Sequence, residues 1–310
     1  MNGDSDRALA TLIAILKANG YHFITPTPAT HARATARRTR ARDIRDVFGW
    51  SLPFSGDVIG PELTELMMRA AVLEQRGELF ASRVRISSLG DDLIVHSAYP
   101  TTQQDAVFFG PDSYRFASFL RAELPRLGPY THILDIGAGA GAGAIAAARV
   151  APDAYFTLTD INPHALRLAA INWVMAHLGP VYFAVCDAIP DDLPDHAPPV
   201  DCIIANPPYI ADPAHRAYRD GGAMHGAEVS LAWARLAAER LPSGGAFLLY
   251  TGSAIVNGED RLKGVLHETL RDFEVSYREL DPDVFGEELE RPDYADVERI
   301  AAVGCVAMKS

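Results

Sequence analysis

The chain has 310 residues, of which 48% are hydrophobic and 22% are charged. This length fits one large domain or two smaller ones, since domains commonly span roughly 100–200 residues. The net charge of −12 argues against a nucleic-acid substrate, because an acidic protein repels phosphates at long range, although a local basic patch could still contact them. Three scattered cysteines are too few for a disulfide framework, and no apolar run reaches the ~20 residues that a membrane span needs. We therefore expect a cytoplasmic globular protein that does not enter a membrane.

The charge is unevenly distributed along the chain. Residues 1–50 carry eight Lys or Arg and four acids, a net charge of +4, so the remaining residues carry −16. Six of the eight basic residues are arginines between Arg33 and Arg45. Such a segment would suit contacts with phosphates. From the sequence alone, a solvated or salt-bridged helix face is the interpretation that we favour.

The first hundred residues show the pattern of three helices followed by a hairpin. The helical patterns cover residues 5–19, 31–47 and 61–76. Apolar runs at 84–86 and 93–95 flank a Leu-Gly-Asp-Asp turn, which predicts a β-hairpin. This order of elements resembles a winged helix. We expect residues 1–100 to form a mainly helical N-terminal domain that docks the substrate.

From about residue 131 the pattern changes to strands that alternate with helices. The strand-like runs lie at 133–134, 155–158, 181–185, 202–204, 247–250, 275–277 and 300–303. The helical segments lie near 142–150, 163–178, 228–241 and 259–272. This alternation predicts an α/β fold, a Rossmann-like, seven-stranded and mostly parallel sheet with helices on both faces. We assign this second domain to residues 105–310.

A glycine-rich turn follows the first of these strands. Asp135 stands two residues before Gly137, and Gly139 and Gly141 follow before a helix begins. Glycines let the backbone turn sharply and approach a ligand closely. A dinucleotide site offers N–H groups to a pyrophosphate, which a leading carboxylate would disfavour. S-Adenosyl-L-methionine has no phosphate and carries a sulfonium and an ammonium group, so the pattern favours this cofactor, with S-adenosyl-L-homocysteine as the product.

Two further acids come at the ends of the next two strand-like runs. Asp160 lies 25 residues after Asp135, close to the interval at which an acid binds ribose hydroxyls in Rossmann folds. Asp187 is placed to accept a hydrogen bond from the adenine amino group. Ligands of such sheets bind beyond the carboxyl ends of the strands, so these acids predict one cofactor site. Ile161 and Ala188, the residues that follow Asp160 and Asp187, are also cofactor-binding candidates.

The fourth strand-like run ends in Asn206-Pro207-Pro208-Tyr209, our four catalytic candidates. Methyl transfer from sulfur to nitrogen is an in-line displacement, so the nitrogen lone pair must point at the methyl group. The Asn206 side-chain oxygen and the Pro207 backbone oxygen can accept the two N–H groups of an amide or aromatic amine. Proline aims its carbonyl rigidly, and Tyr209 offers an aromatic face to a planar group. Because it lies at the same strand ends, Asn206 is also a cofactor-binding candidate.

Residues 131–209 resemble the amino-methyltransferases with an Asn-Pro-Pro-Tyr signature, and most of all the HemK-like protein-(glutamine-N5) methyltransferases. The run Tyr218-Arg219-Asp220-Gly221-Gly222 is similar to the glycine-rich loop that this branch carries after its catalytic motif. The resemblance extends from about residue 105 to the end of the chain. It implies that the substrate amide is held by Asn206 and Pro207, and the cofactor by Asp135, Gly137, Asp160 and Asp187.

The sequence leaves two acceptors open. A protein glutamine amide is favoured, with a translation-related protein as the expected partner. The alternative is an exocyclic amine of adenine or guanine in RNA or DNA, because the same two-carbonyl geometry serves both. Rivals from other classes are a binding module without catalysis and an NAD-dependent dehydrogenase, against which Asp135 and the Asn-Pro-Pro-Tyr motif argue. No Cys or His spacing suits a metal, so we expect none.

Overall fold

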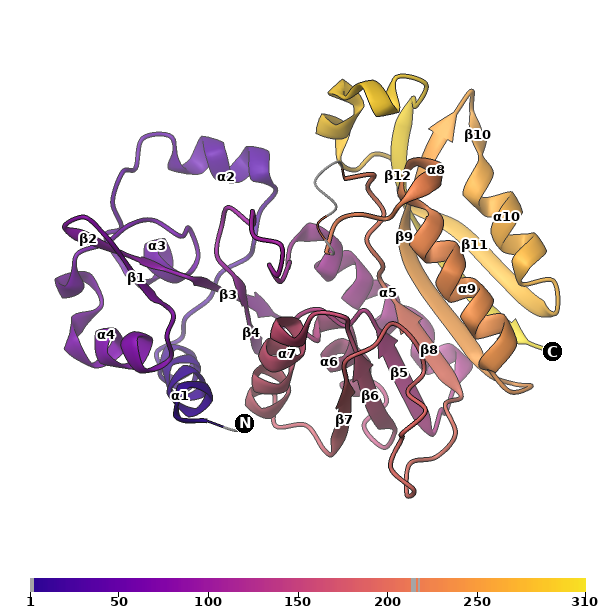
Figure 1. Cartoon of the computed structure of the whole chain (residues 1–310), viewed down its shortest axis with the longest axis horizontal. Coiled ribbons are helices and arrows are strands. Elements are labelled where there is room, and N and C mark those ends of the chain that lie inside the picture. The colour runs from indigo at the N-terminus through magenta and orange to yellow at the C-terminus, as the bar shows by residue number, and fades with distance from the viewer. Residues whose placement is uncertain (1–2, 213–215, 217) are drawn as a thin grey trace. The chain divides into compact units, whose positions relative to one another are not determined.

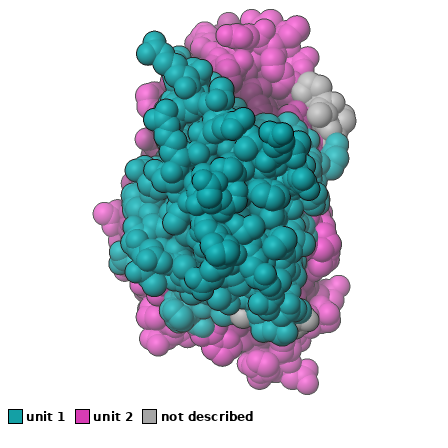
Figure 2. Space-filling model, turned by 90° about the vertical axis from the view of Figure 1, so that its left-hand side faces the viewer, with its two compact units in different colours: residues 1–115, 139–142, 164–178 teal, residues 116–138, 143–163, 179–310 magenta. Residues whose placement is uncertain are grey.

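The computed structural model describes residues 3–212, 216 and 218–310. The chain divides into two compact units, which Figure 2 colours separately. Unit 1 comprises residues 1–115, 139–142 and 164–178, and unit 2 comprises residues 116–138, 143–163 and 179–310. The glycine-rich turn and the helix after the second sheet strand thus belong largely to the unit that contains the N-terminus. Among the described residues, no helix is both long and apolar enough to cross a membrane.

Unit 1 contains helices followed by two antiparallel hairpins (Figure 1). Its first helices are α1 (Asp4–Ala18), α2 (Pro28–Thr35), α3 (Ile44–Phe48), the short 3-10 helix η1 (Gly56–Val58) and α4 (Gly60–Arg69). Its strands are β1 (Leu73–Arg76), β2 (Leu79–Ser82), β3 (Val84–Leu89) and β4 (Asp92–Ser97). β1 pairs with β2, and β3 pairs with β4, which confirms the hairpin predicted around residues 84–95.

Two of the predicted helices in this region need correction. The segment 31–47 is not one helix, because Thr27 caps α2 and Asp43 separately caps α3 by accepting backbone N–H groups. The third predicted helix ends at Arg69. Ala71 then adopts a left-handed φ of 57°, which breaks the helical path, and the residues up to Arg76 form β1 instead.

A buried asparagine joins three segments of unit 1. Asn172, on α7 (Pro163–Met175), has no exposed surface. Its Oδ1 accepts the N–H of Val95 at 2.8 Å, and its Nδ2 donates to the carbonyls of Val95 at 3.0 Å and Ala140 at 2.9 Å. Val95 lies in β4, and Ala140 lies in the glycine-rich turn. One amide group therefore ties the hairpin, the helix and that turn together.

Unit 2 contains the predicted sheet. Its strands are β5 (His132–Ile136), β6 (Tyr155–Thr159), β7 (Val181–Ala184), β8 (Cys202–Ala205), β9 (Ala246–Val256), β10 (Glu259–Asp260), β11 (Phe273–Asp281) and β12 (Arg299–Lys309). The order across the sheet is β11-β12-β9-β8-β5-β6-β7, with the two-residue β10 beside β9. β5 to β9 pair in parallel, whereas β11 and β12 run antiparallel. The prediction of a seven-stranded, mostly parallel sheet is confirmed, with β10 as an addition.

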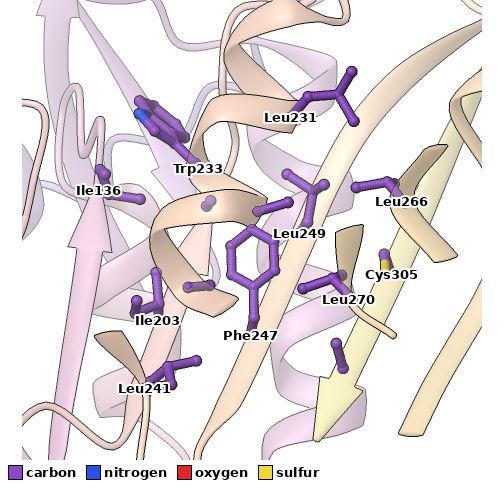
Figure 3. Close-up of a cluster of buried hydrophobic side chains, with 14 of the residues drawn as sticks. Ile136, Ile203, Leu231, Trp233, Leu241, Phe247, Leu249, Leu266, Leu270 and Cys305 are labelled. Atoms are coloured by element: carbon purple, nitrogen blue, oxygen red, sulfur yellow. The ribbon is translucent and has the colours of Figure 1, made fainter. Parts of the chain in front are cut away.

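Helices and short 3-10 turns complete the described part of the chain. They are α5 (Pro111–Leu127), α6 (Ala142–Ala148), α8 (Ala223–Gly226), α9 (Glu228–Arg240), α10 (Arg261–Thr269), η2 (Gly286–Glu290) and η3 (Pro292–Tyr294). Figure 3 shows apolar side chains of β8 and β9, such as Ile203 and Phe247, packed with Leu231 of α9 and Leu266 of α10. Burial of these side chains stabilises the central strands by the hydrophobic effect, so the strand ends that carry the site have a fixed base.

Replacing Asn172 with alanine should lower the free energy of unfolding by about 3 kcal/mol. The change leaves a buried N–H group and two buried carbonyls of unit 1 without their partners. Chemical denaturation measures the effect. Asn19→Ala is the control, because Asn19 is exposed at the end of α1 and should lose less than about 0.5 kcal/mol. Similar losses in the two variants would contradict the joining role of Asn172.

Candidate functional site

The carboxyl ends of three neighbouring strands lie at one level of the sheet. The last residues of β6 and β8 both pair with the last residue of β5, so the chain leaves these strands at Gly137, Asp160 and Asn206. Neighbouring strands lie about 4.8 Å apart, which places the backbones of Asp160 and Asn206 about 10 Å apart, one on each side of Gly137. The chain order reverses between β5 and β8, and ligands of open α/β sheets bind at such a reversal.

The glycine-rich turn after β5 depends on its glycines in two ways. Gly137, Gly139 and Gly141 have left-handed φ angles of 68°, 54° and 77°, which other residues rarely adopt. A Cβ at Gly137 would also overlap the indole ring of Trp233. Among the described residues, apart from Gly139 itself and its two chain neighbours, no atom lies within 4 Å of the position that a Cβ on Gly139 would take. The turn is therefore packed at its start and open at its second glycine.

Asp135 is a buried carboxylate at the end of β5, with 2% of its surface exposed. Its Oδ2 accepts the N–H of Ala144, in α6, at 2.8 Å. Burial raises the pKa of Asp135 to about 7, the hydrogen bond from Ala144 lowers it, and the charge of Asp160 raises it. Within the described chain, no Lys or Arg forms an ion pair with Asp135. A cation bound nearby would favour the ionised form, which fits the charge of S-adenosylmethionine.

Asp160 and Ile161 form an acid–apolar pair after β6. Asp160 is half-buried, and its Oδ1 accepts the N–H of Asn162 at 2.8 Å, which turns the chain towards α7. Ile161 has 56% of its surface exposed, which is unusual for a large apolar residue. A carboxylate beside an exposed apolar face suits a ligand that combines sugar hydroxyls with a flat ring.

Asp187 does not lie at the level of the other strand ends. We expected the third strand to run up to Asp187, but β7 ends at Ala184. The N–H of Cys186 turns back to the carbonyl of Ala184 at 3.1 Å, so the chain leaves the sheet three residues before the acid. Asp187 is exposed and Ala188 is half-buried on the loop that follows.

The Asn-Pro-Pro-Tyr motif begins at the residue that follows β8. Asn206 and Pro208 are half-buried, whereas Pro207 is buried. Tyr209 is 7% exposed, and its ring meets Tyr250 and Phe285 edge to face, with ring centroids 6.5 Å and 5.7 Å apart. The packed ring anchors the motif to the protein. Its predicted role as an aromatic face for the substrate stays a prediction.

β9 and the glycine-rich loop after the motif contact it closely. A Cβ at Gly252, in β9, would overlap the ring of Tyr209. Gly226 has a φ of 94°, and a Cβ there would overlap the carbonyl oxygen of Tyr209. The N–H of Gly221 donates to the carbonyl of Ile210 at 2.8 Å. The sequence resemblance drew attention to this loop, and the contacts explain why it needs glycines at these places.

A partly buried ion-pair network that the sequence analysis did not single out follows the motif. Arg216 donates to both carboxylate oxygens of Asp212 at 2.7 Å, and this pairing lowers the pKa of Asp212 to about 2. Arg219 pairs with Glu288, which also accepts a hydrogen bond from Arg291 at 2.7 Å. The local signals for it are the spacings of Asp212 and Arg216, four residues apart, and of Glu288 and Arg291, three residues apart. Residues 213–215 and 217 lie outside the described residues.

Comparison with known proteins gives the family. Residues 104–276 match the family model of the methyltransferase small domain. The chain is 32% identical over 151 residues to the mouse methyltransferase HEMK2, covering 45% of this chain and 68% of that relative. The chain belongs to the methyltransferase small domain family. It is an S-adenosylmethionine-dependent methyltransferase, as the sequence predicted, and its similarity to a HemK-type protein is confirmed.

Two other similarities concern a curated relative and a solved structure. It is 36% identical over 88 residues to the ribosomal RNA large subunit methyltransferase G of Pseudomonas syringae pv. tomato, covering 28% of this chain and 22% of that relative. The chain thus spans about a fifth of that relative's length. The solved structure of a SAM-dependent methyltransferase from Agrobacterium tumefaciens aligns with 76% of this chain, and the alignment includes 72% of that protein's chain. The TM-score is 0.47 and the sequence identity is 16%.

In the cofactor-free methyltransferase, Asp135→Asn should raise the stability above about pH 7. The folded-state pKa of about 7 lies above the ordinary value of 3.8, so ionisation of Asp135 opposes folding increasingly as the pH rises between these values. Asparagine stays neutral and can still accept from Ala144. The gain in free energy of unfolding should grow from near zero at about pH 4 to about 4 kcal/mol above about pH 7. Urea denaturation across this range measures it, and a pH-independent difference would contradict the assignment.

Gly252→Ala should lower both the stability and the methyl-transfer rate, because the new Cβ displaces the ring of Tyr209. Overpacking of this kind destabilises by about 1–3 kcal/mol. Gly264→Ala is the matched control, since Gly264 lies in α10 and, apart from its chain neighbours and the nearby backbone of that helix, no described atom lies within 4 Å of the added Cβ. Alanine also favours a helix. Thermal unfolding and transfer rates are compared. A Gly252→Ala variant as stable and active as the control would disprove the anchoring role of Tyr209.

Proposed function

We propose that this methyltransferase transfers the methyl group of S-adenosylmethionine to a planar nitrogen that carries two hydrogens. The supporting observation is the position of Asn206, which leaves β8 at the same level as the glycine-rich turn leaves β5. The side-chain oxygen of Asn206 and the main-chain oxygen of Pro207 offer two acceptors there. A reacting group with two N–H donors matches these acceptors.

The proposed cofactor contacts use the neighbouring strand ends. The buried carboxylate of Asp135 suits the positive charge of S-adenosylmethionine, and the carboxylate of Asp160 suits the ribose hydroxyls. The exposed side chain of Ile161 provides an apolar surface for the adenine ring. The remaining proposed cofactor residues are Gly137, Gly139 and Gly141 in the turn, Asp187 and Ala188 after β7, and Asn206. The bound cofactor supplies an activated methyl group on a sulfonium sulfur.

Asn206 and Pro207 would prepare the nitrogen for attack. The lone pair of an amide or aromatic amine is delocalised into its plane, and two hydrogen bonds from its N–H groups can draw the nitrogen towards a pyramidal geometry. As the new nitrogen–carbon bond forms and the sulfur–carbon bond breaks, positive charge develops on the nitrogen. The two oxygens would stabilise that charge through the hydrogen bonds that they accept. The sulfur would leave with the bonding electron pair as S-adenosyl-L-homocysteine, and the nitrogen would release one proton to water, which leaves a neutral methylated product.

Two acceptor classes carry such a nitrogen. The side-chain amide of a protein glutamine, in a translation-related protein, is favoured by the resemblance to HemK-like enzymes. The exocyclic amine of adenine or guanine in a nucleic acid is supported by the similarity to a methyltransferase named for ribosomal RNA. Asn206 and Pro207 suit both equally, since both nitrogens are planar and carry two hydrogens. The choice between the two acceptors therefore depends on the surface that binds the larger molecule. We propose that the protein acts in the cytoplasm.

Asn206→Ala should lower the transfer rate by at least about 100-fold, the usual effect of removing one hydrogen-bonding group that acts on the transition state. Its affinity for S-adenosylmethionine should change by less than about threefold. Transfer of labelled methyl groups to macromolecules of a cell extract measures the rate, and isothermal titration measures the affinity. Full activity in the variant would contradict the proposed mechanism. A loss of cofactor binding together with activity would contradict the assignment of Asn206 to the acceptor.

A further inference from the structure

The segment from the last turn of α2 to the first turn of α3 exposes a group of arginines. The exposed members are Arg33, Arg37, Arg40, Arg42 and Arg45. Within the described part of the chain, none of these five forms an ion pair. Residues 7–42 contain no Asp or Glu at all. These five arginines are solvated, which is one of the two alternatives that the sequence favoured, although Arg37, Arg40 and Arg42 lie outside a helix. We call these five residues the arginine surface.

The sixth arginine of the segment holds the arginine surface in place. Asp46 is 5% exposed, and its Oδ1 accepts from Nη1 of Arg38 at 2.7 Å. The other oxygen of Asp46 accepts the backbone N–H of Arg42 at 3.1 Å. Nε of Arg38 donates to the carbonyl of Ala34, in α2, at 3.0 Å. These bonds connect the end of α2 to α3, so the exposed guanidinium groups extend from a fixed backbone.

An aromatic cluster lies beside the same backbone. The guanidinium carbon of Arg38 is 4.9 Å from the centre of the half-buried Trp50 ring. His31 contacts Trp50 and Tyr99, with ring centroids 5.5 Å and 4.0 Å apart. Burial, together with the charges of Arg85 and Arg38, lowers the pKa of His31 to about 4. His31 is therefore neutral near pH 7, and the positive charge of this region comes from arginine alone.

The charge of the two units differs strongly. Unit 1 contains fourteen Lys or Arg and thirteen Asp or Glu, a net charge of +1, so unit 2 carries −13. A polyanion is repelled by unit 2 at long range. Residues 33–46 contain six arginines and two acids, a net charge of +4, and this excess creates a local positive field that acts over about 10 Å at moderate salt. The arginine surface is where a polyanion would be attracted.

We propose that the arginine surface docks RNA with unpaired bases, which carries the acceptor amine. Arginine matches phosphate bidentately and stacks on exposed bases, whereas lysine acts only as a point charge. All six basic residues of the segment are arginine, and the exposed guanidinium planes are of the kind on which bases stack. An acidic peptide would match the charge but would leave these stacking planes unused. The inference rests on the proposed function only for the acceptor, because RNA binding itself requires no catalysis.

The test is an anisotropy titration of a fluorescein-labelled RNA hairpin with an unpaired loop, using the full chain without S-adenosylmethionine. Two triple variants each remove three exposed positive charges. They are Arg37→Ala/Arg40→Ala/Arg42→Ala in the arginine surface and, as the control, Arg235→Ala/Arg261→Ala/Arg271→Ala in unit 2. Each phosphate contact of a single strand contributes about 0.7 to the slope of log affinity against log salt. The first variant should lose about 2 from that slope and bind at least about tenfold more weakly, whereas the control should match the wild type.

Equal weakening in both variants, or none in the first, would overturn the proposal, provided that thermal unfolding shows both variants folded. A labelled polyglutamate peptide is titrated in parallel. Binding of that peptide, lost in the first variant, without binding of RNA would assign the arginine surface to an acidic protein and overturn the proposal as well. The two proposals can fail separately. Unchanged methyl transfer by Asn206→Ala would contradict the proposed function, whereas the RNA titration of the wild type and the two triple variants would still test the docking of RNA.

Discussion

Parallel pairing of β5 with β6 on one side and with β8 on the other determines where every proposed reacting group lies. Because the three strands end on paired residues, the turn at Gly137, the acid Asp160 and the amide Asn206 leave the sheet at the same level. A shift of one residue in β8 would move Asn206 by about 3.3 Å and reverse the face of each side chain in that strand. The buried apolar residues of β8 and β9 oppose such a shift. The proposed chemistry thus depends on strand register.

The residues around the carboxyl ends of these strands are closely packed. Tyr209 lies against the backbone of β9, and the loop through Gly221 and Gly226 leaves no room for a side chain, so Asn206 is held between a strand and an anchored residue. Asp135 is the exception to this stability. Its burial without a cationic partner is unfavourable when it is ionised, and the pKa of about 7 expresses that. A positively charged cofactor would relieve this cost, which links cofactor binding to the stability of the turn.

Much of unit 2 could be predicted, because strands buried on both faces are continuous apolar runs, such as residues 202–204, that end at chemically distinctive residues. Local sequence does not specify where a strand stops pairing, so the exit of β7 at Ala184, before Asp187, could not be predicted. The contacts of Asn172 join segments far apart in the chain, and no local sequence pattern predicts them. The break between the two helices of the arginine segment did have a sequence signal, because Asp43 is a residue type that caps helices. The helix-favouring composition on both sides of Asp43 favoured one continuous helix instead.

The central claim is that a planar nitrogen with two hydrogens, carried by RNA that docks on the arginine surface, accepts the methyl group. The most direct measurement is the position of the label after incubation with methyl-labelled S-adenosylmethionine and a cell extract, determined by nuclease digestion and mass spectrometry of the products. Our account predicts a nuclease-sensitive label on the exocyclic nitrogen of adenine or guanine. A label that survives nuclease and lies on a protein, such as on a glutamine amide, would contradict the claim, as would a label on a carbon, an oxygen or a ring nitrogen of the RNA.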